Sequence, residues 1–298
     1  MDSEPRTITV CVCTFRRPAM LARLLEKLAE QRSDGRFRLA AVVCDNDGAQ
    51  SARPVVEEFA RRVAFPVAYT HEPEQNIALA RNRALAAAGG EFVAFIDDDE
   101  FPVADWLLRM LETCEEFSAA GVLGPVRPHF DQEPPRWLID GGFCERPEYP
   151  SGRVLGWEET RTGNVLFRRR MVEGMAEPFR RELGTGGEDK DFFMRMMQQG
   201  HVFRWCNEGP VYETVPPERW RRSYLLKRAL LRGNNVLKIP SGHALLIAKS
   251  LLATPVYLLL LPFALPRGQH VVMKYCIKLC DHVGRLLALV GMNPVRER

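Results

Sequence analysis

Three consecutive aspartates, Asp97, Asp98 and Asp99, follow directly on the apolar run EFVAFI at residues 91–96. Their charges repel one another, and burial of a carboxylate beside an apolar segment costs free energy unless the charge is compensated. One explanation is a divalent-metal site, because hard oxygen ligands gather where a cation lies among them. The alternative is a solvated turn after a strand, where carboxylates are common.

Apolar runs and helical patterns alternate along the chain up to this triplet. Strand-like runs lie at 8–13, 39–44, 67–71 and 91–96, and helical patterns lie at about 19–31, 51–63 and 76–88, the last capped by Asn76. This alternation predicts βαβ units and therefore an α/β fold with a Rossmann-like, doubly wound, mostly parallel sheet. Ligands of such sheets bind at the carboxyl ends of the strands, and the triplet lies at one of these ends.

The composition is that of a globular protein, with 46% hydrophobic and 27% charged residues. The 41 basic and 38 acidic residues leave a net charge of only +3, which gives no case for a nucleic-acid partner. The eight cysteines contain no CxxC pair, so we expect reduced thiols in a cytosolic compartment rather than a zinc or disulfide framework. The first ten residues lack the basic, apolar and small-residue succession of a signal peptide.

Four short motifs occur in an informative order. CTFRRP follows the first predicted strand, CDNDG follows the second, NIALARNRAL opens the helix before the fourth, and FIDDDE ends the fourth. In these motifs the sequence resembles glycosyltransferase family 2, the inverting enzymes of the glycosyltransferase A fold. The family pattern runs PTYNRP, DDGS, G-x-x-x-ARN and DxD, and the resemblance covers residues 8 to about 235.

The resemblance implies a metal site at the triplet. Asp97 and Asp99 match the DxD motif that ligates a divalent cation, Mg²⁺ or Mn²⁺, on the diphosphate of the donor. Glu213 lies where relatives supply another metal ligand, often a histidine. The chemistry agrees, because a nucleoside diphosphate is a poor leaving group until its charge is neutralised, and a bound metal does this as a Lewis acid.

The resemblance also implies a nucleotide-sugar site. DNDG replaces DDGS, so the choice between Asp45 and Asp47 as the residue that binds the base or ribose stays open. Asn76 replaces the usual glycine, and Asp98 either contacts the ribose or caps the turn. The residues assigned to nucleotide-sugar binding are Thr14, Phe15, Arg17, Asp45, Asp47, Asn76, Arg81, Asn82, Asp97 and Asp98.

An inverting transfer needs a base that takes the proton from the acceptor hydroxyl. The segment TGGEDKDFF at 185–193 resembles the ED motif of the family, which implies Asp189 as the catalytic base. Glu188 and Asp191 are close enough in sequence to compete for this role. The alternative is an acidic first helical turn, which the helix dipole favours.

The C-terminal part predicts a membrane-associating helical appendage. An apolar tract at 244–266 contains Lys249, Pro255 and Pro262, and its length nearly meets what a spanning helix needs. The next stretch, 271–290, is amphipathic, with Lys274, Lys278, Asp281, His282 and Arg285 on its polar face. Six basic residues precede the tract: Arg219, Arg221, Arg222, Lys227, Arg228 and Arg232. The alternative is a helical pair packed on the core or on a partner subunit.

These features together predict a metal-dependent enzyme at the cytoplasmic face of a bacterial inner membrane. We expect a catalytic domain at 1–235, with a nucleotide-sugar half at 1–124 and an acceptor half at 125–235, followed by a membrane-associated region at 236–298. The expected reaction moves a sugar from a UDP-sugar or related donor to a glycan or lipid-linked acceptor of surface polysaccharide, one sugar per encounter. The alternatives are a sugar-phosphate nucleotidyltransferase and a catalytically inactive membrane scaffold of the same fold. The loop TFRRP is not the Gly-rich phosphate loop of the former, and retained acidic motifs argue against the latter.

Overall fold

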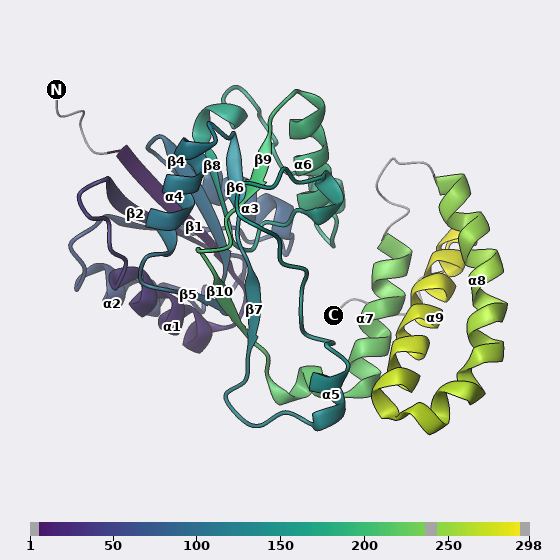
Figure 1. The fold of residues 1–298 in the computed structure, drawn as a ribbon. Coiled ribbons are helices and arrows are strands. Elements are labelled where there is room, and N and C mark those ends of the chain that lie inside the picture. The colour runs from purple at the N-terminus through teal and green to yellow at the C-terminus, as the bar shows by residue number, and fades with distance from the viewer. Residues whose placement is uncertain (1–5, 236–242, 293–298) are drawn as a thin grey trace. The chain divides into compact units, whose positions relative to one another are not determined.

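The computed structural model describes residues 6–235 and 243–292 (Figure 1). The chain forms two compact units, one of Met1–Arg127 and Arg146–Glu213 and the other of Pro128–Glu145 and Thr214–Arg298. This division differs from the predicted domains because helix α7 (Arg222–Asn235) packs on α9 (Gln269–Leu289) in the second unit. The segment 236–242, where the predicted C-terminal region begins, and residues 1–5 of the signal-peptide argument lie outside the described residues.

A seven-stranded sheet forms the centre of the first unit, in the order β3-β2-β1-β4-β8-β6-β9. β1 (Arg6–Thr14), β2 (Phe37–Asp45), β3 (Val67–His71) and β4 (Phe92–Asp97) are parallel, as predicted. β8 (Val165–Arg168) runs antiparallel between β4 and β6 (Gly121–Leu123), and β9 (Phe203–Trp205) is parallel to β6. The prediction of a mostly parallel sheet is confirmed.

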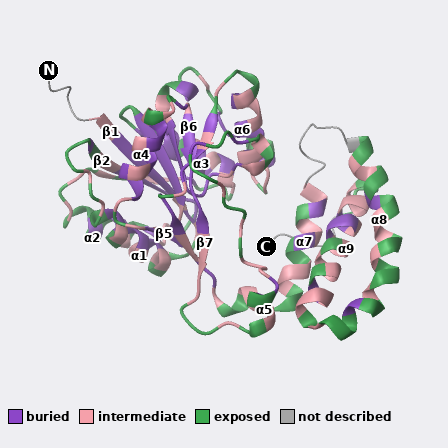
Figure 2. Cartoon of the chain, in the orientation of Figure 1, coloured by how far each residue is buried: buried purple, intermediate pink, exposed green. Residues whose placement is uncertain are grey.

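Helices cover both faces of this sheet. Along β1, Ile8 and Val10 face a core shared with α1 (Pro18–Ala29), α2 (Arg53–Ala60) and α4 (Trp106–Glu116). Cys11 faces the opposite core, which contains side chains of α3 (Ile77–Ala87) and α6 (Glu188–Gln198). Figure 2 shows the middle of this sheet as largely buried, whereas the edge strand β3 has no buried residue. Because successive strand residues point to opposite faces, this near-continuous apolar pattern is what a sheet covered on both sides requires.

A second, three-stranded sheet has the order β5-β10-β7, with β5 (Glu100–Pro102), β10 (Val211–Thr214) and β7 (Val126–His129). β5 and β10 are antiparallel, and Glu213 lies opposite Glu100. Short 3-10 helices complete the described connections: η1 (Trp157–Glu159), η2 (Arg169–Val172), η3 (Arg181–Leu183), η4 (Pro217–Trp220) and η6 (Leu265–Arg267). The small sheet therefore places two glutamates beside the end of β4.

Helices form the second unit: α5 (Arg136–Asp140), α7, α8 (His243–Ala264) and α9, with α7 and α8 both packed on α9. Two residues of the predicted polar face of α9, Asp281 and His282, are buried. Arg232 donates to the two carboxylate oxygens of Asp281 over 2.8 and 2.7 Å, and a ring nitrogen of His282 lies 3.1 Å from Ser250 Oγ. Buried polar groups keep such partners because an unpaired one is costly.

Candidate active site

Three neighbouring strands bring predicted site residues to one edge of the central sheet. Thr14 ends β1 and lies beside Asp45, the last residue of β2, while Cys13 lies beside Asp97, the last residue of β4. Parallel strands end at the same edge, so the sheet gathers the motifs that the sequence separates. The aspartate triplet is at the carboxyl edge, where the sequence predicted it.

Arg17 compensates much of the charge of the triplet. Its Nη1 donates to Asp98 Oδ1 over 3.0 Å and to Asp99 Oδ2 over 3.1 Å. Asp98 also accepts a 2.8 Å hydrogen bond from the Thr14 hydroxyl. Burial raises the pKa of Asp98, and the Arg17 charge opposes this effect. A metal is therefore not the sole compensation for the triplet, and the Asp98 carboxylate is held by Thr14 and Arg17.

The carboxylates of Asp97, Asp98, Asp99 and Glu100 form an acidic edge at the end of β4. Asp97 and Glu100 are its less compensated members. The Asp97 N–H donates to Glu100 Oε2 over 3.1 Å, while Glu100 Oε1 is buried and has no hydrogen-bond partner among the described residues. A Cβ atom on Gly163 would lie 2.7 Å from Glu100 Oε1 and 3.1 Å from Asp97 Oδ2, so both carboxylates face this glycine. Burial and the charges of Asp99 and Asp98 raise the pKa of Asp97 to about 6, against the effect of Arg81.

Glu100 was not assigned a role by the sequence argument, although it directly follows the triplet. Burial and the nearby Asp97 charge raise its pKa well above the usual range. Glu213, its partner across β5 and β10, forms an ion pair with Arg146. In the described ranges 6–235 and 243–292, no three His, Cys, Asp or Glu side chains converge as a ready metal site. Yet an orphaned buried oxygen beside a carboxylate with a raised pKa fits a cation-binding position.

The two acidic residues of CDNDG are held by their own loop. The Asp45 carboxylate accepts hydrogen bonds from the N–H groups of Asp47 and Ala52, over 3.0 and 2.8 Å, and from Tyr69 Oη over 3.2 Å. Asp47 accepts a 3.1 Å hydrogen bond from Nε of Arg16. Both aspartates are buried. Asp45 thus stabilises the turn into α2, and Asp47 is tied to the loop after β1 that also contains Phe15.

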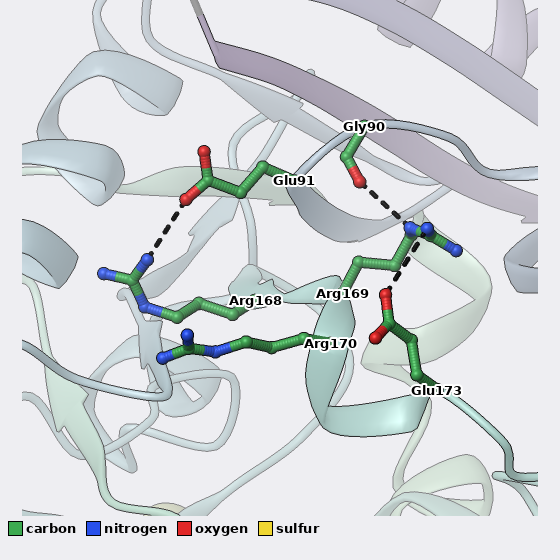
Figure 3. Close-up of a pocket in the computed structure, with 6 residues that line it drawn as sticks. All are labelled: Gly90, Glu91, Arg168, Arg169, Arg170 and Glu173. Atoms are coloured by element: carbon green, nitrogen blue, oxygen red, sulfur yellow. Dashed lines mark hydrogen bonds and ion pairs between the residues drawn. The ribbon is translucent and has the colours of Figure 1, made fainter.

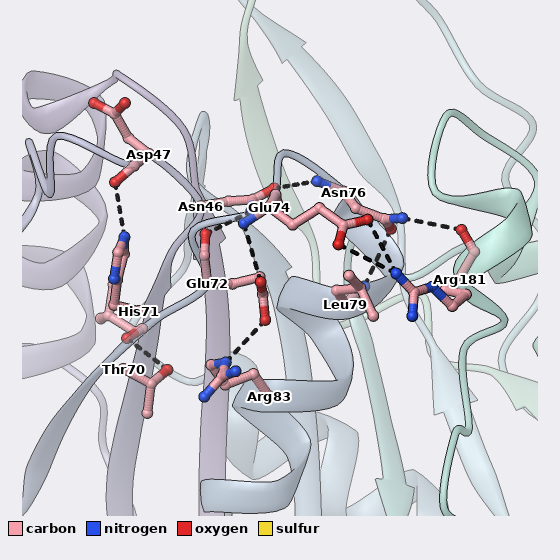
Figure 4. A network of polar contacts seen from close by, with 11 residues as sticks. Asn46, Asp47, Thr70, His71, Glu72, Glu74, Asn76, Leu79, Arg83 and Arg181 are labelled. Atoms are coloured by element: carbon pink, nitrogen blue, oxygen red, sulfur yellow. Dashed lines mark hydrogen bonds and ion pairs between the residues drawn. The ribbon is translucent and has the colours of Figure 1, made fainter.

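Asn46, between these aspartates, joins the loops at this edge (Figure 4). Its amide nitrogen donates to the carbonyls of Glu72 and Glu74 over 2.9 and 2.6 Å, and its amide oxygen accepts from the Asn76 N–H over 3.0 Å. The Asn76 side chain in turn accepts hydrogen bonds from two N–H groups in the first turn of α3, which confirms the predicted cap. The network fixes the start of α3 against the end of β2.

Helix α3 carries the ARN motif, and two of its residues contact the first residue of α6 and the chain before it. The Arg81 guanidinium is buried, forms an ion pair with Glu188 and lies 3.7 Å from Asp97 Oδ1. Asn82 exchanges two hydrogen bonds with the backbone of Phe179: its Nδ2 donates to the carbonyl over 2.7 Å, and its Oδ1 accepts from the N–H over 2.9 Å. Arg81 therefore bridges the acidic edge and the predicted base segment.

The three carboxylates proposed as base differ in their surroundings. Glu188 is buried against Arg81. Asp191 is fully buried, with its oxygens 2.8 Å from Arg195 Nε and 3.3 Å from Arg180 Nη1. Asp189 is partly exposed, and across the described parts of the chain no side chain forms an ion pair with it; its Oδ1 accepts from the Lys190 N–H over 2.7 Å. Asp189 is thus the member of the three that a substrate hydroxyl can approach.

Two partly buried cations, Arg161 and Lys190, lie near the carboxylates of the site. Burial and the Arg146 charge lower the pKa of Arg161 to about 10, while Glu100 acts in the opposite direction. Burial lowers the pKa of Lys190, whose ammonium donates to the carbonyls of Glu158 and Thr160 over 2.6 and 2.5 Å. Removal from water is the first cause of both lowered pKa values, because burial disfavours the charged form. The nearby carboxylates act in the opposite direction, Glu100 on Arg161 and Asp189 on Lys190.

A separate pocket of about 160 Å³ lies at the opposite end of β4, where Arg168 pairs in register with Phe92 (Figure 3). Arg168 Nη1 lies 3.3 Å from Glu91 Oε1, and Arg169 Nε donates to the Gly90 carbonyl over 2.9 Å. The lining residues are Gly90, Glu91, Arg168, Arg169, Arg170 and Glu173. Ion pairs between neighbouring residues hold this pocket, and none of the predicted site residues lines it.

The two-faced, mostly parallel sheet with carboxylates at its carboxyl edge defines a glycosyltransferase A fold. A family model described as "Glycosyl transferase family 2" matches residues 9–182. The chain belongs to glycosyltransferase family 2 and is a glycosyltransferase. It is 36% identical over 312 residues to the succinoglycan biosynthesis protein ExoM of Rhizobium meliloti (strain 1021). The alignment covers 100% of this chain and 97% of ExoM.

Further relatives and solved structures agree with the fold. The putative glycosyltransferase EpsH of Bacillus subtilis (strain 168) is 26% identical over 64% of this chain and 56% of EpsH. The mannosyltransferase PcManGT from Pyrobaculum calidifontis, solved with GDP-Man and Mn²⁺, superimposes with a TM-score of 0.63 at 18% identity, over 96% of this chain and 88% of that one. S. aureus TarS 1–349 with UDP-GlcNAc gives a TM-score of 0.55 at 15% identity, over 97% and 93%.

Proposed function

We propose that this glycosyltransferase transfers a sugar, with inversion, from a nucleoside diphosphate sugar to a glycan or lipid-linked acceptor in bacterial surface polysaccharide synthesis. The observation that carries the proposal is the position of Arg81. Its guanidinium forms an ion pair with Glu188, the residue before Asp189, and lies 3.7 Å from Asp97 Oδ1 at the end of β4. Names of relatives, a succinoglycan biosynthesis protein and a hyaluronan synthase, support polysaccharide as the product. The complex of TarS with UDP-GlcNAc supports a UDP-sugar donor, although the complex of PcManGT contains GDP-Man.

Divalent metal fits the acidic edge of this chain. Asp97 and Glu100 would hold Mg²⁺ or Mn²⁺, with Asp99 and Glu213 as the further carboxylates that the family pattern assigns. The orphaned Glu100 oxygen and the raised pKa of Asp97 support this assignment. When bound, the metal supplies charge neutralisation to the leaving diphosphate. Arg17 keeps the triplet folded by pairing with Asp98 and Asp99.

The proposed base is Asp189. Its partly exposed carboxylate accepts the proton of the acceptor hydroxyl as that oxygen attacks the anomeric carbon, and the nucleoside diphosphate leaves from the opposite face. The positive groups of Arg161 and Lys190 favour the negative charges of the substrates in the same region. Glu188 and Asp191 are engaged by arginines, so we assign them to holding the first turn of α6.

A transfer assay with a panel of nucleotide sugars tests the proposed reaction. With lipid-linked glycans as acceptors and Mn²⁺ present, we expect release of UDP that depends on both the donor and the acceptor. Membership of glycosyltransferase family 2 favours this reaction over nucleotidyl transfer. Formation of a nucleotide sugar from a nucleoside triphosphate and a sugar phosphate would instead support the nucleotidyltransferase alternative, and no turnover with any donor would support the inactive scaffold.

We propose that the second unit attaches the enzyme to an anionic cytoplasmic membrane surface. Within the described residues, the stretch Ala244–Arg267 alone has the length and apolar composition to cross a membrane, with a mean hydropathy of 2.0. Pro255, Pro262 and Lys249 disfavour a single straight span, because freed backbone groups and a charge need partners in lipid. Large apolar side chains of α8 are exposed: Leu245, Leu251, Leu252, Val256, Leu258, Leu259, Leu260 and Phe263. Basic residues of α7 suit anionic lipid headgroups and a cytoplasmic orientation.

Replacement of Leu252 and Leu259 by glutamate should release the protein from membranes. Both side chains are more than 70% exposed, so they are not part of the packed interior of the second unit. We expect flotation with anionic liposomes to fall at least tenfold for Leu252→Glu with Leu259→Glu, while UDP binding stays unchanged. Val202→Glu is the matched control, since Val202 is an exposed apolar residue of the first unit. A wild-type protein that ignores anionic liposomes would indicate that α8 packs on a partner subunit.

A further inference from the structure

We propose that Asn82 is a positioning residue for the base Asp189, and that it acts by holding the segment 179–188 on helix α3. The proposal rests on the proposed function, in which Asp189 takes the acceptor proton. It replaces the role that the family resemblance implies for Asn82, which is contact with the nucleotide. It also gives the ARN motif a structural task on the acceptor side of the reaction.

The contact between Asn82 and Phe179 is a two-point clamp. The amide oxygen and nitrogen of Asn82 each form a hydrogen bond to the backbone of Phe179, over 2.9 and 2.7 Å. The Phe179 ring is fully buried, 5.8 Å from the ring of Phe95 on β4 and 4.7 Å from that of Phe192 on α6. Asn82 therefore anchors the segment at a point that also packs between the sheet and the helix that carries Asp189.

Helix α3 holds the same segment at three later points. Asn76 Nδ2 donates to the Arg181 carbonyl over 2.9 Å, as Figure 4 shows, and the Ile77 N–H donates to the Gly184 carbonyl over 3.3 Å. A Cβ on Gly184 would lie 1.9 Å from Asn76 Oδ1, so this approach requires glycine. The ion pair between Arg81 and Glu188 completes the series. The chain before Asp189 is thus attached to one helix at residues 179, 181, 184 and 188.

This attachment matters because the chain itself provides little stiffness here. Gly186 and Gly187 have φ values of 131° and 99°, in the region that favours glycine, and α6 begins at the next residue. Glycines have no side chain to fix the path of the segment, so its course depends on the contacts to α3. A displacement of about 1 Å at a reacting group can cost about 10²-fold in rate. Loss of the Asn82 clamp should therefore change catalysis more than donor binding.

The test compares Asn82→Ala with Arg83→Ala in the full-length protein. Arg83 is the next residue of α3, and its side chain pairs with Glu72 over 3.0 Å, away from the segment. We expect Asn82→Ala to lower kcat about 10²-fold with KM for the donor unchanged, and UDP affinity by calorimetry to stay within twofold of wild type. Arg83→Ala should leave all three quantities near their wild-type values.

Hydrogen–deuterium exchange provides a readout that does not need an acceptor. The Phe179 amide donates to Asn82, so Asn82→Ala should lose protection at Phe179 and through 184–189, and Arg83→Ala should not. A loss of UDP affinity in step with kcat would overturn the proposal and return Asn82 to the nucleotide site, and unchanged exchange would overturn it as well. If exchange changes as expected but no variant or wild-type protein transfers sugar, the fault lies in the proposed function.

A second variant reaches the same segment without altering Asn82. Gly184→Ala introduces a methyl group against Asn76, at a backbone φ of −63° that alanine adopts freely. We expect the same pattern as for Asn82→Ala: lower kcat, faster exchange at 184–189 and unchanged UDP affinity. If Gly184→Ala shows faster hydrogen–deuterium exchange at 184–189 but keeps the wild-type kcat, the proposal is overturned. That result would show that the course of this segment does not control the base.

Discussion

Asp189→Asn should abolish sugar transfer while donor binding stays intact. Asparagine keeps the size of the side chain but cannot accept the acceptor proton, and loss of a general base typically costs about 10²–10⁴-fold in rate. Asp189 is partly exposed and makes no ion pair with a described side chain, so its replacement removes no ion pair, and the asparagine oxygen can still accept from the Lys190 N–H. Turnover assays and calorimetry with a UDP-sugar should therefore separate chemistry from binding.

Asp191→Asn is the informative comparison. Asp191 is fully buried between Arg195 and Arg180, and breaking a buried pair destabilises a protein by about 3 kcal/mol or more. We expect this variant to lose thermal stability, whereas Asp189→Asn should melt like the wild type. If Asp189→Asn loses donor affinity together with activity, Asp189 serves the nucleotide site or the fold, and the assignment of the base is wrong.

Asp97→Asn should remove metal-dependent donor binding. Even outer contacts of a metal site commonly change affinity by about 10–100-fold, so loss of a direct carboxylate should cost at least as much. The raised pKa of Asp97, about 6, gives a second signature. Asp97 is neutral below this pH and anionic above it, so Mn²⁺-dependent UDP binding should strengthen as the pH rises through about 6. Calorimetry across pH 5–8 measures both effects.

Asp98→Asn is the matched control for this experiment, since Asp98 contacts Thr14 and Arg17 within the same triplet. It should keep the metal dependence and the rise in UDP affinity near pH 6. Its neutral side chain no longer forms an ion pair with Arg17, which weakens the hold on the loop after β1. Asp99→Asn should weaken both metal response and donor affinity if the DxD assignment holds. Full donor affinity of Asp97→Asn without added metal would show that the acidic edge does not bind a cation.

The sequence predicted the elements whose signals are local. The apolar strands, the Asn76 cap and the position of the triplet follow from periodicity, side-chain chemistry and the common edge of parallel strands. The roles of residues that depend on distant partners could not be predicted in this way. Asn82 contacts Phe179, 97 positions away, and Glu100 gains significance from burial and from its position opposite Glu213.

The polar face of α9 shows the same limit. Its spacing of charged residues is that of a surface helix, yet Asp281 and His282 are buried because Arg232 and Ser250 on other helices satisfy them. Helical periodicity reports which residues share a face, and it does not report which neighbouring helix covers that face. The same applies to Glu188 and Asp191, which compete with Asp189 by their position in the sequence, because sequence spacing does not report that arginines engage them.

The anomeric configuration of the transferred sugar tests the central claim most directly. With an α-linked UDP-sugar as donor, proton NMR of the purified product should show a β-glycosidic linkage from a single displacement with Asp189 as base. An α-linked product would mean retention of configuration, and it would contradict both the inverting mechanism and the role assigned to Asp189.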